Sequence, residues 1–154
     1  MLIHVKATHY DFYKRRINEL CDAFPLAFSK SFPHPLVIGI HKQLAERTSF
    51  TPKEISVLLR IWTHRAEYLA MGQSVGSRVD LDGNLTLMSE EHVKGFVAIH
   101  PKMRDHFIKG FSKRFKKAYG RPAFLAVPIS LRKEIEVKGC SGCENCKVAA
   151  RSNN

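Results

Sequence analysis

Long hydrophobic runs are missing from this chain of 154 residues, and no apolar stretch approaches the roughly 20 residues that cross a bilayer. The N-terminal residues also lack the basic and then apolar order of a secretory signal peptide. We therefore expect no stable membrane insertion and a cytoplasmic location. The hydrophobic content of 44% excludes a wholly disordered chain and is enough for one domain with a core.

Catalytic motifs are missing as well. The sequence has no serine nucleophile elbow, no glycine-rich phosphate loop with a lysine, and no H-E-x-x-H zinc motif. Asp80 and Asp82 are close in sequence, but aspartates at a hairpin turn usually serve the geometry of the turn. The eight histidines are scattered along the chain. We therefore predict that the protein is not an enzyme.

Acidic residues are scarce, above all near the C-terminus. The formal net charge is +11; residues 1–100 carry 12 Lys and Arg against 10 Asp and Glu, whereas residues 101–154 carry 13 against 4. Such an excess favours a polyanionic partner, because each neutralised phosphate releases counterions. An anionic membrane surface would be attracted by the same charge, and a merely soluble basic protein would also carry it.

Cysteine is rare outside one cluster, which holds Cys140, Cys143 and Cys146 at C-x-x-C-x-x-C spacing. Three cysteines at this spacing can wrap one metal ion, and we favour zinc over an iron–sulfur cluster. A redox pair and three free thiols are the alternatives. A metal site would need a fourth ligand from elsewhere in the chain. The candidates for that ligand are His100, His106 and Cys21.

The most informative stretch runs from residue 60 to residue 84 and predicts the end of a helix followed by a β-hairpin. Apolar residues recur at helical spacing as far as Leu69. Residues 77–81 alternate in the manner of a strand, and Asp82-Gly83-Asn84 is a strong hairpin-turn signal.

Three side chains of this stretch would meet if the hairpin folds back beside the helix. Arg60 and Tyr68 fall on or beside the polar face of the helical region, and Arg78 would approach both of them. Two guanidinium groups and a phenol suit a phosphate and a nucleotide. A threonine at residue 63 could cap a new segment, which would place Arg60 and Tyr68 on two helices joined by a bend.

Further helices are predicted from hydrophobic periodicity and caps. The second one, residues 36–47, would hold Gly39 in its first turn and Ile38 on its apolar side. At Gly39 free backbone N–H groups would let a phosphate approach; close helix packing is the alternative role of this glycine. Short strands are predicted at residues 124–127 and 134–137. The remaining helices are expected at residues 9–23, from Pro52, from Glu90, and from Pro101 to Tyr119. Thr51 and Glu54 predict a capping box at the start of the helix from Pro52.

The order of these features resembles the FinO/ProQ family of bacterial RNA chaperones. The sequence PLVIGIHKQL at residues 35–44, the pair Tyr68-Leu69 and RVDLDGN at residues 78–84 follow one another as in that family. The step of ten residues from Tyr68 to Arg78 is also that of the family, and the match covers roughly residues 17–97. It implies a mostly α fold with a small β-hairpin.

The resemblance also implies a domain organisation and a function. We expect a FinO/ProQ-like domain at residues 9–100 and a basic extension with the cysteines at residues 101–154. The domain would bind structured RNA at the base of a hairpin and its single-stranded 3′ tail, as in the terminators of small RNAs and messages. It would stabilise RNA and promote RNA–RNA pairing in post-transcriptional regulation, without a cofactor. The alternative function is a metal- or redox-responsive regulator that uses the cysteine cluster.

By resemblance, Arg60, Tyr68 and Arg78 match the arginine, tyrosine and arginine with which the family contacts RNA. Gly39 matches its helix-start glycine, and Leu69 would support Tyr68 from the core. The arginines would clamp 3′-terminal phosphates, and Tyr68 would pack on or hydrogen-bond the terminal nucleotide.

Two further RNA contacts, Lys42 and Lys53, are predicted on charge and position alone. The chain departs from the family at Val37 and Ser56, where basic residues are often found. Both departures weaken the positive surface of the domain, and the charge after residue 100 would compensate for them.

The segment from residue 102 to residue 119 is a basic amphipathic helix. Met103, Phe107, Phe111 and Phe115 recur at intervals of four, and lysines and arginines fill most other positions. We favour a helix that packs its aromatic stripe on the domain and presents its lysines to RNA. Self-association and binding to an anionic membrane are the alternatives.

Overall fold

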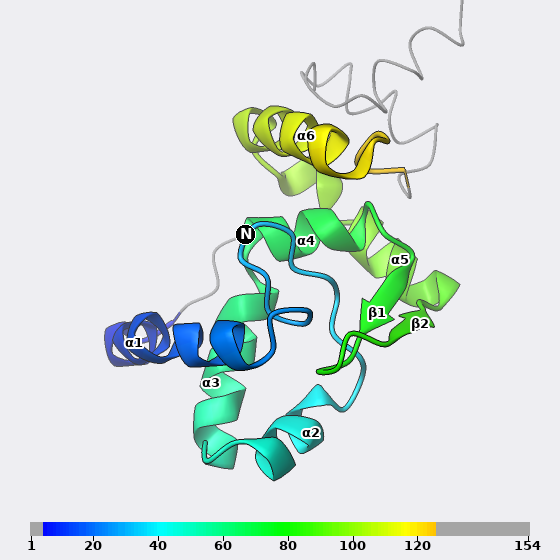
Figure 1. Ribbon diagram of the computed structural model, residues 1–154. Helices are drawn as coiled ribbons and strands as arrows, with labels where there is room; N and C mark the ends of the chain where they lie inside the picture. The colour runs from blue at the N-terminus through cyan, green and yellow to red at the C-terminus, as the bar shows by residue number, and fades with distance from the viewer. Residues whose placement is uncertain (1–4, 126–154) are drawn as a thin grey trace, which may run out of the picture. The chain divides into compact units, whose positions relative to one another are not determined.

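The computed structural model describes residues 5–125, which form a mostly helical chain with one small β-hairpin (Figure 1). The predicted fold class is thereby confirmed. The strand predicted at residues 124–127 lies only partly within the described residues, where Phe124, with a φ of +59°, and Leu125 are not in a strand. The strand predicted at residues 134–137 and the cysteine cluster lie outside the described residues. The elements are α1 (Ala7–Ala23), α2 (Ile40–Arg47), α3 (Pro52–Thr63), α4 (Ala66–Gly72), β1 (Ser77–Val79), β2 (Leu85–Leu87), α5 (Glu90–Val97), a 3₁₀ turn (His100–Lys102) and α6 (Asp105–Tyr119).

Two compact units make up the chain. The first unit runs to Tyr68 and includes the hairpin Ser77–Leu87; the second holds Leu69–Gly76 and the residues from Met88 onward. The predicted division at residue 100 followed charge and family resemblance, and it stays a prediction. No helix among residues 5–125 has the length and apolarity that a membrane span requires.

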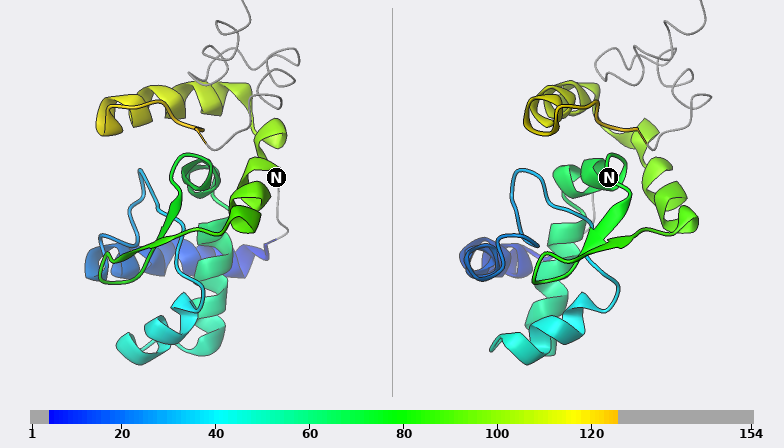
Figure 2. Two further views of the ribbon diagram at one scale, coloured as in Figure 1. Left: turned by 90° about the vertical axis from the view of Figure 1, so that its right-hand side faces the viewer. Right: turned by 45° about the vertical axis from the view of Figure 1, so that its right-hand side comes forward.

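The core of the first unit forms where α3 contacts both α1 and α2. The left view of Figure 2 shows α1 lying across α3. Leu20 of α1, Leu44 of α2 and Leu58 of α3 are fully buried, and so is Trp62, whose ring lies 5.2 Å from that of Phe28. Burying such side chains is the main favourable term in folding.

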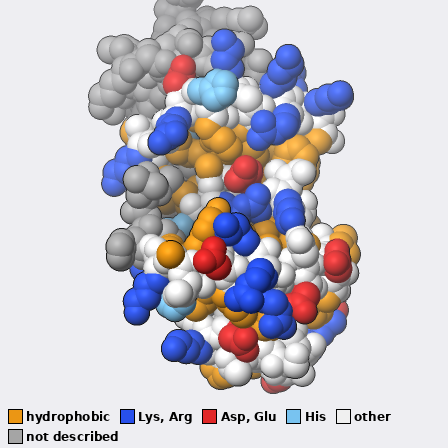
Figure 3. All heavy atoms as spheres, turned by 90° about the vertical axis from the view of Figure 1, so that its left-hand side faces the viewer, with side chains coloured by type: hydrophobic (Ala, Val, Ile, Leu, Met, Phe, Trp, Pro, Cys, Tyr) orange, Lys and Arg blue, Asp and Glu red, His pale blue; other side chains and the backbone are white. Residues whose placement is uncertain are grey.

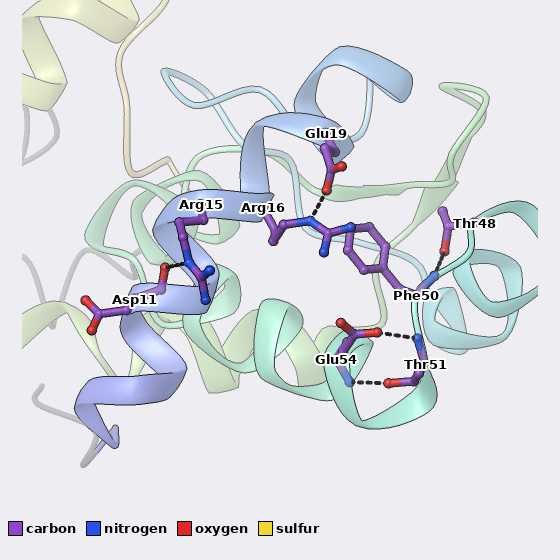
Figure 4. A network of polar contacts seen from close by, with 8 residues as sticks. All are labelled: Asp11, Arg15, Arg16, Glu19, Thr48, Phe50, Thr51 and Glu54. Atoms are coloured by element: carbon purple, nitrogen blue, oxygen red, sulfur yellow. Dashed lines mark hydrogen bonds and ion pairs between the residues drawn. The ribbon is translucent and has the colours of Figure 1, made fainter.

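The capping box predicted at the start of α3 is confirmed (Figure 4). Thr51 Oγ1 accepts a hydrogen bond from the N–H of Glu54 (3.2 Å), and Glu54 Oε1 accepts one from the N–H of Thr51 (2.9 Å). The second bond lowers the pKa of the Glu54 carboxyl below its usual value. Next to this cap, the Arg16 guanidinium of α1 pairs with Glu19 and lies over the Phe50 ring at 4.8 Å. Local capping and contact with α1 therefore fix the same end of α3.

One carboxylate organises the hairpin turn. Asp80 Oδ1 accepts hydrogen bonds from the N–H groups of Asp82 and Asn84, both at 2.9 Å, and Oδ2 accepts one from Asn84 Nδ2 at 3.0 Å. Gly83 has a φ of +87° and lies against Leu26, so a side chain there would be strained and would collide. Asp80 therefore serves the turn geometry, in line with the interpretation from sequence.

The predicted start of α2 is wrong. The helix begins at Ile40, Gly39 precedes it as N-cap, and Ile38 is 76% exposed instead of lying on an apolar face. Residues 35–37 are extended because they pair with β1: Val79 N–H donates to Pro35 O (2.8 Å), and Val37 N–H donates to Val79 O (2.9 Å). A helix over these residues would forfeit both bonds.

In the second unit, α6 ends at Gly120, as predicted, but begins at Asp105, after the 3₁₀ turn that contains Pro101. Phe111 and Phe115 are fully buried. The predicted packing of the aromatic stripe is thus confirmed for these two rings.

The segment after α6 folds back onto the end of α4. The N–H of Phe124 donates to Ser74 Oγ, and the Arg121 guanidinium donates to the Ser74 carbonyl, both at 2.9 Å. Nearby, His100 Nδ1 lies 2.6 Å from Gln73 Oε1 in a fully buried pair. The segment after α6 and His100 therefore both make polar contacts with the residues that follow α4.

Gly72→Ala and Gly95→Ala should change the stability in opposite directions. A Cβ at Gly72 would lie 2.1 Å from the Phe96 ring, whereas one at Gly95 would meet nothing within 4 Å. We expect Gly72→Ala to destabilise by about 1–3 kcal/mol through overpacking. Gly95→Ala, in the middle of α5, should stabilise by about 0.5–1 kcal/mol. Urea unfolding of both variants checks this, and an equal effect of the two would contradict the described packing.

The acid dependence of stability should include a contribution from Asp80. Hydrogen bonds from Asn84 lower the pKa of Asp80 below its ordinary value of 3.8. The carboxylate therefore contributes stability above that value, and this contribution is lost as pH falls through the lower folded-state pKa. The stability difference between wild type and Asp80→Asn should be present at neutral pH and vanish in acid.

Asp82→Asn is the matched control, because within the described part of the chain it breaks one exposed ion pair, with Arg47 (2.8 Å). Urea unfolding over a pH series measures both variants. If the stability losses of Asp80→Asn and Asp82→Asn depended on pH in the same way, the hydrogen bonds to Asp80 would make no acid-sensitive contribution of their own.

Candidate functional site

Two of the predicted site residues meet at the backbone of Leu36. Leu36 N–H donates to Tyr68 Oη at 3.0 Å, and Arg78 Nη1 donates to Leu36 O at 2.7 Å. Tyr68 comes from α4 and Arg78 from β1, so the segment around Leu36 is bonded to two elements that follow it by more than 30 residues in the sequence. The predicted approach of Arg78 to Tyr68 is confirmed.

The sequence positions Leu36 through its neighbours. Proline lacks an N–H and fixes φ, so Pro33 and Pro35 favour an extended chain over a helix. Pro35 and Val37 then pair with Val79 of β1, and Leu36 is 3% exposed. Sequence reasoning missed this segment, although the two prolines were the signal that could have revealed it.

Arg78 is partly buried and incompletely satisfied. Its Nε is buried and has no hydrogen-bond partner among residues 5–125, and the side chain makes no ion pair there. A buried donor without a partner costs roughly 1–3 kcal/mol, and a charged one costs more. The planar guanidinium has further donors that match an anion such as a phosphate. The arrangement is therefore that of an anion-binding group held in place by Leu36.

The prediction that Tyr68 falls on or beside the polar face of the helical region is wrong. The side chain is 5% exposed, because its hydroxyl is used inside the fold by Leu36. Burial raises the pKa of the Tyr68 phenol, and the Leu36 N–H and Arg78 partly oppose this rise. The phenol is consequently neutral at physiological pH, and its contacts are those of a residue that positions Leu36 and Arg78.

Gly39 has a conformational role. Its φ is +86°, and a Cβ there would meet nothing within 4 Å. Glycine is therefore required by the left-handed backbone at the N-cap of α2, where no side chain caps the helix, and close helix packing does not explain it. Leu69 is buried at 6% exposure and belongs to the second unit.

The other predicted residues line two adjacent pockets beside α3. Arg60 and Lys53 lie in one of about 390 Å³, and Lys42 lies in one of about 440 Å³; Ser56 borders both. The remaining lining residues of the first are Val5, Lys6, His9, Val57 and Ile61, and those of the second are His41, Ala45, Pro52, Ile55 and Leu59.

Lys6, His9 and His41 were missed from the sequence. They come from α1, the residue before it, and α2, so only the packing of these helices on α3 places them beside Lys53 and Lys42. They add positive or titratable groups around Ser56. Side chains from other elements therefore partly replace the positive charge that a basic residue at position 56 would supply.

The described residues bear little on a metal site. Within residues 5–125 no three His, Cys, Asp or Glu side chains are grouped so as to hold a metal ion. Of the candidate fourth ligands for the cysteine cluster, His106 is exposed, whereas His100 is buried against Gln73. Burial raises the pKa of the Cys21 thiol.

Comparison with known families identifies the chain. The model of the ProQ/FINO family matches residues 11–117. The chain belongs to the ProQ/FINO family. The match extends beyond the residues 17–97 from which the resemblance was drawn, and it takes in most of α6.

Individual relatives are similar over part of their length. The RNA chaperone ProQ of Shewanella frigidimarina is 31% identical over 115 residues, which cover 71% of this chain and 55% of that protein. The RNA chaperone ProQ of Vibrio vulnificus is 37% identical over 87 residues, 53% of this chain and 42% of that protein. The chain thus spans about half the length of these curated relatives.

One solved structure is also similar. It is the solution NMR structure of a ProQ homolog from Legionella pneumophila, which is 25% identical in sequence. The match covers 66% of this chain and 88% of that chain, with a TM-score of 0.46.

Tyr68→Phe should destabilise the protein by about 1–3 kcal/mol, because the buried N–H of Leu36 would lose its acceptor. Tyr10→Phe is the control. Tyr10 is 48% exposed, so the loss of its hydroxyl should change the free energy of unfolding by less than about 0.5 kcal/mol. Chemical denaturation measures both. Equal stability of the two variants would mean that the Tyr68 hydroxyl does not hold Leu36.

Proposed function

We propose that this protein is a cytoplasmic RNA chaperone that binds structured RNA at the base of a hairpin with a single-stranded 3′ tail. Such ends occur on terminators of small RNAs and messages. Binding would stabilise the RNA and promote its pairing with other RNAs, with no catalytic step and no cofactor. The family membership supports RNA as the ligand, and Arg78 carries the assignment of the site.

Arg78 is the group that we propose contacts the RNA end. Its buried Nε lacks a partner, its Nη1 is anchored on Leu36, and no carboxylate neutralises it among the described residues. A 3′-terminal phosphodiester would supply the missing negative charge and would accept hydrogen bonds from the remaining guanidinium N–H groups. Tyr68 would act through Leu36 by holding the segment that anchors Arg78, which fits its 5% exposure better than stacking on a base.

The neighbouring elements of the first unit would hold the rest of the RNA. Gly39 leaves the N-cap of α2 open, three residues after Leu36, so backbone N–H groups of this segment could receive the 3′ end. Arg60, Lys53 and Lys42 line the two pockets around Ser56, where they would neutralise phosphates further along the RNA. Leu69 would support Tyr68 from the buried core.

The cysteine cluster supports a second proposal of lesser scope. Cys140, Cys143 and Cys146 would bind zinc by their spacing, a site that RNA binding itself does not need. Metal analysis of the purified full chain tests this directly.

An RNA-binding assay tests the main proposal. The probes are a terminator hairpin with a U-tail and a free 3′-hydroxyl, and the same hairpin with a blocked or missing tail. Arg78→Gln should weaken binding of the free end by about 10-fold or more, the usual size of a charged hydrogen bond, and should abolish the preference over the blocked end.

Arg15→Gln is the matched control, because Arg15 is an exposed arginine of α1 whose one hydrogen bond to residues 5–125 is to the Asp11 carbonyl. It should change the affinity less than about twofold, since exposed charges contribute little individually. If wild type binds both RNAs alike, or if Arg78→Gln behaves like Arg15→Gln, the 3′-end site at Arg78 is refuted.

A further inference from the structure

The apolar face of helix α6 is already packed inside its own unit. Ile108, Phe111 and Phe115 are at most 1% exposed, and the Phe111 ring packs on Phe115 (5.8 Å) and Phe124 (5.7 Å). An amphipathic helix that binds a membrane must insert its apolar face into the lipid. The apolar face of α6 is filled within its own unit, so neither a bilayer nor a second copy can take it without unfolding that core.

The opposite face of α6 is a stripe of lysines. Lys109, Lys113, Lys116 and Lys117 are exposed and follow one another at steps of four, three and one, which places them on one side of a helix. Lys109 and Lys117 are about 12 Å apart along the axis, at 1.5 Å per residue. Figure 3 shows mostly blue side chains over α6, whereas blue and red are mixed over α1.

Three of these four lysines have no acidic partner among the described residues. Lys109, Lys113 and Lys117 form no ion pair in the part of the chain that the structure describes. Asp105, in the first turn, is the one acidic residue of α6. Lysines that were merely solvating a surface would usually alternate with acids, as Lys94 does with Glu90 on α5 (3.3 Å). The stripe is thus a concentrated positive potential that nothing within the helix balances.

We propose that this lysine stripe of α6 is a second RNA-binding surface, which holds the phosphates of an RNA strand by charge and does not read its sequence. Its length allows it to meet several successive phosphates. Lysine suits this role, since it is a flexible point charge without the fixed fork of arginine. The inference rests on the proposed RNA binding, but it is independent of the recognition of the 3′ end by Arg78.

The test compares two triple variants that lose the same charge. Lys109, Lys113 and Lys117→Gln removes the stripe; Lys14, Lys30 and Lys94→Gln removes three exposed lysines that contact Asp11, Asn18 and Glu90. Both are measured with the free-end and blocked-end hairpins over a series of salt concentrations. Thermal unfolding of each variant shows that it is folded, and Lys109, Lys113 and Lys117→Arg tests whether charge alone restores binding.

We expect the stripe variant to bind both hairpins about 10-fold more weakly, with the free-end preference unchanged. The slope of log affinity against log salt should become flatter by about 2–3, since each phosphate contact contributes about 0.7–0.9. The control should change affinity less than about twofold, and the arginine variant should bind like wild type.

Equal affinities of the two glutamine variants would overturn the proposal. It would also be overturned if the stripe variant kept its RNA affinity but lost co-sedimentation with vesicles of anionic lipid, which would assign the stripe to membranes. Failure of the proposed 3′-end site gives a different result: wild type would bind free and blocked ends alike, while the effect of the stripe on affinity and salt slope would remain.

Discussion

The pair of hydrogen bonds at Leu36 is the interaction on which the candidate site depends. Leu36 N–H donates to Tyr68 Oη, and the Leu36 carbonyl accepts from Arg78 Nη1. One residue of the segment that leads into α2 is therefore bonded to both α4 and β1. A guanidinium held in this way loses little freedom when it takes up a ligand. In the proposed site Tyr68, which is 5% exposed, would act by positioning Arg78 through Leu36 and would not contact the RNA itself.

Charge is distributed differently in the two units. In the first unit Arg78, Arg60, Lys53 and Lys42 are separate groups set in pockets or on the backbone, which suits recognition of a defined RNA end. In the second unit the lysines of α6 form a repeated row, which suits contact with a phosphate backbone of any sequence. Under the two proposals, the first surface would supply specificity and the second would supply general affinity.

Local signals in the sequence were sufficient for much of this structure. The Thr51 capping box, the turn at Asp82-Gly83-Asn84 and the aromatic period of α6 depend on residues at most a few positions apart, and each was predicted. The start of α2 and the burial of Tyr68 were not. Both are decided by the pairing of residues 35–37 with Val79, more than 40 residues away, and such pairing overrides local helical propensity. Likewise, Lys6 and His9 join Lys53 only through helix packing.

The central claim is that Arg78, held by Leu36, receives the RNA end, and NMR of the Arg78 side chain tests it most directly. The Nε–H resonance of Arg78 would be followed while the free-end or the blocked-end hairpin is added. We predict a large shift of this resonance with the free end only, because a phosphate bound to the guanidinium changes the charge environment of its Nε–H. An unchanged Arg78 resonance in a saturated complex, with shifts confined to α6, would contradict the account.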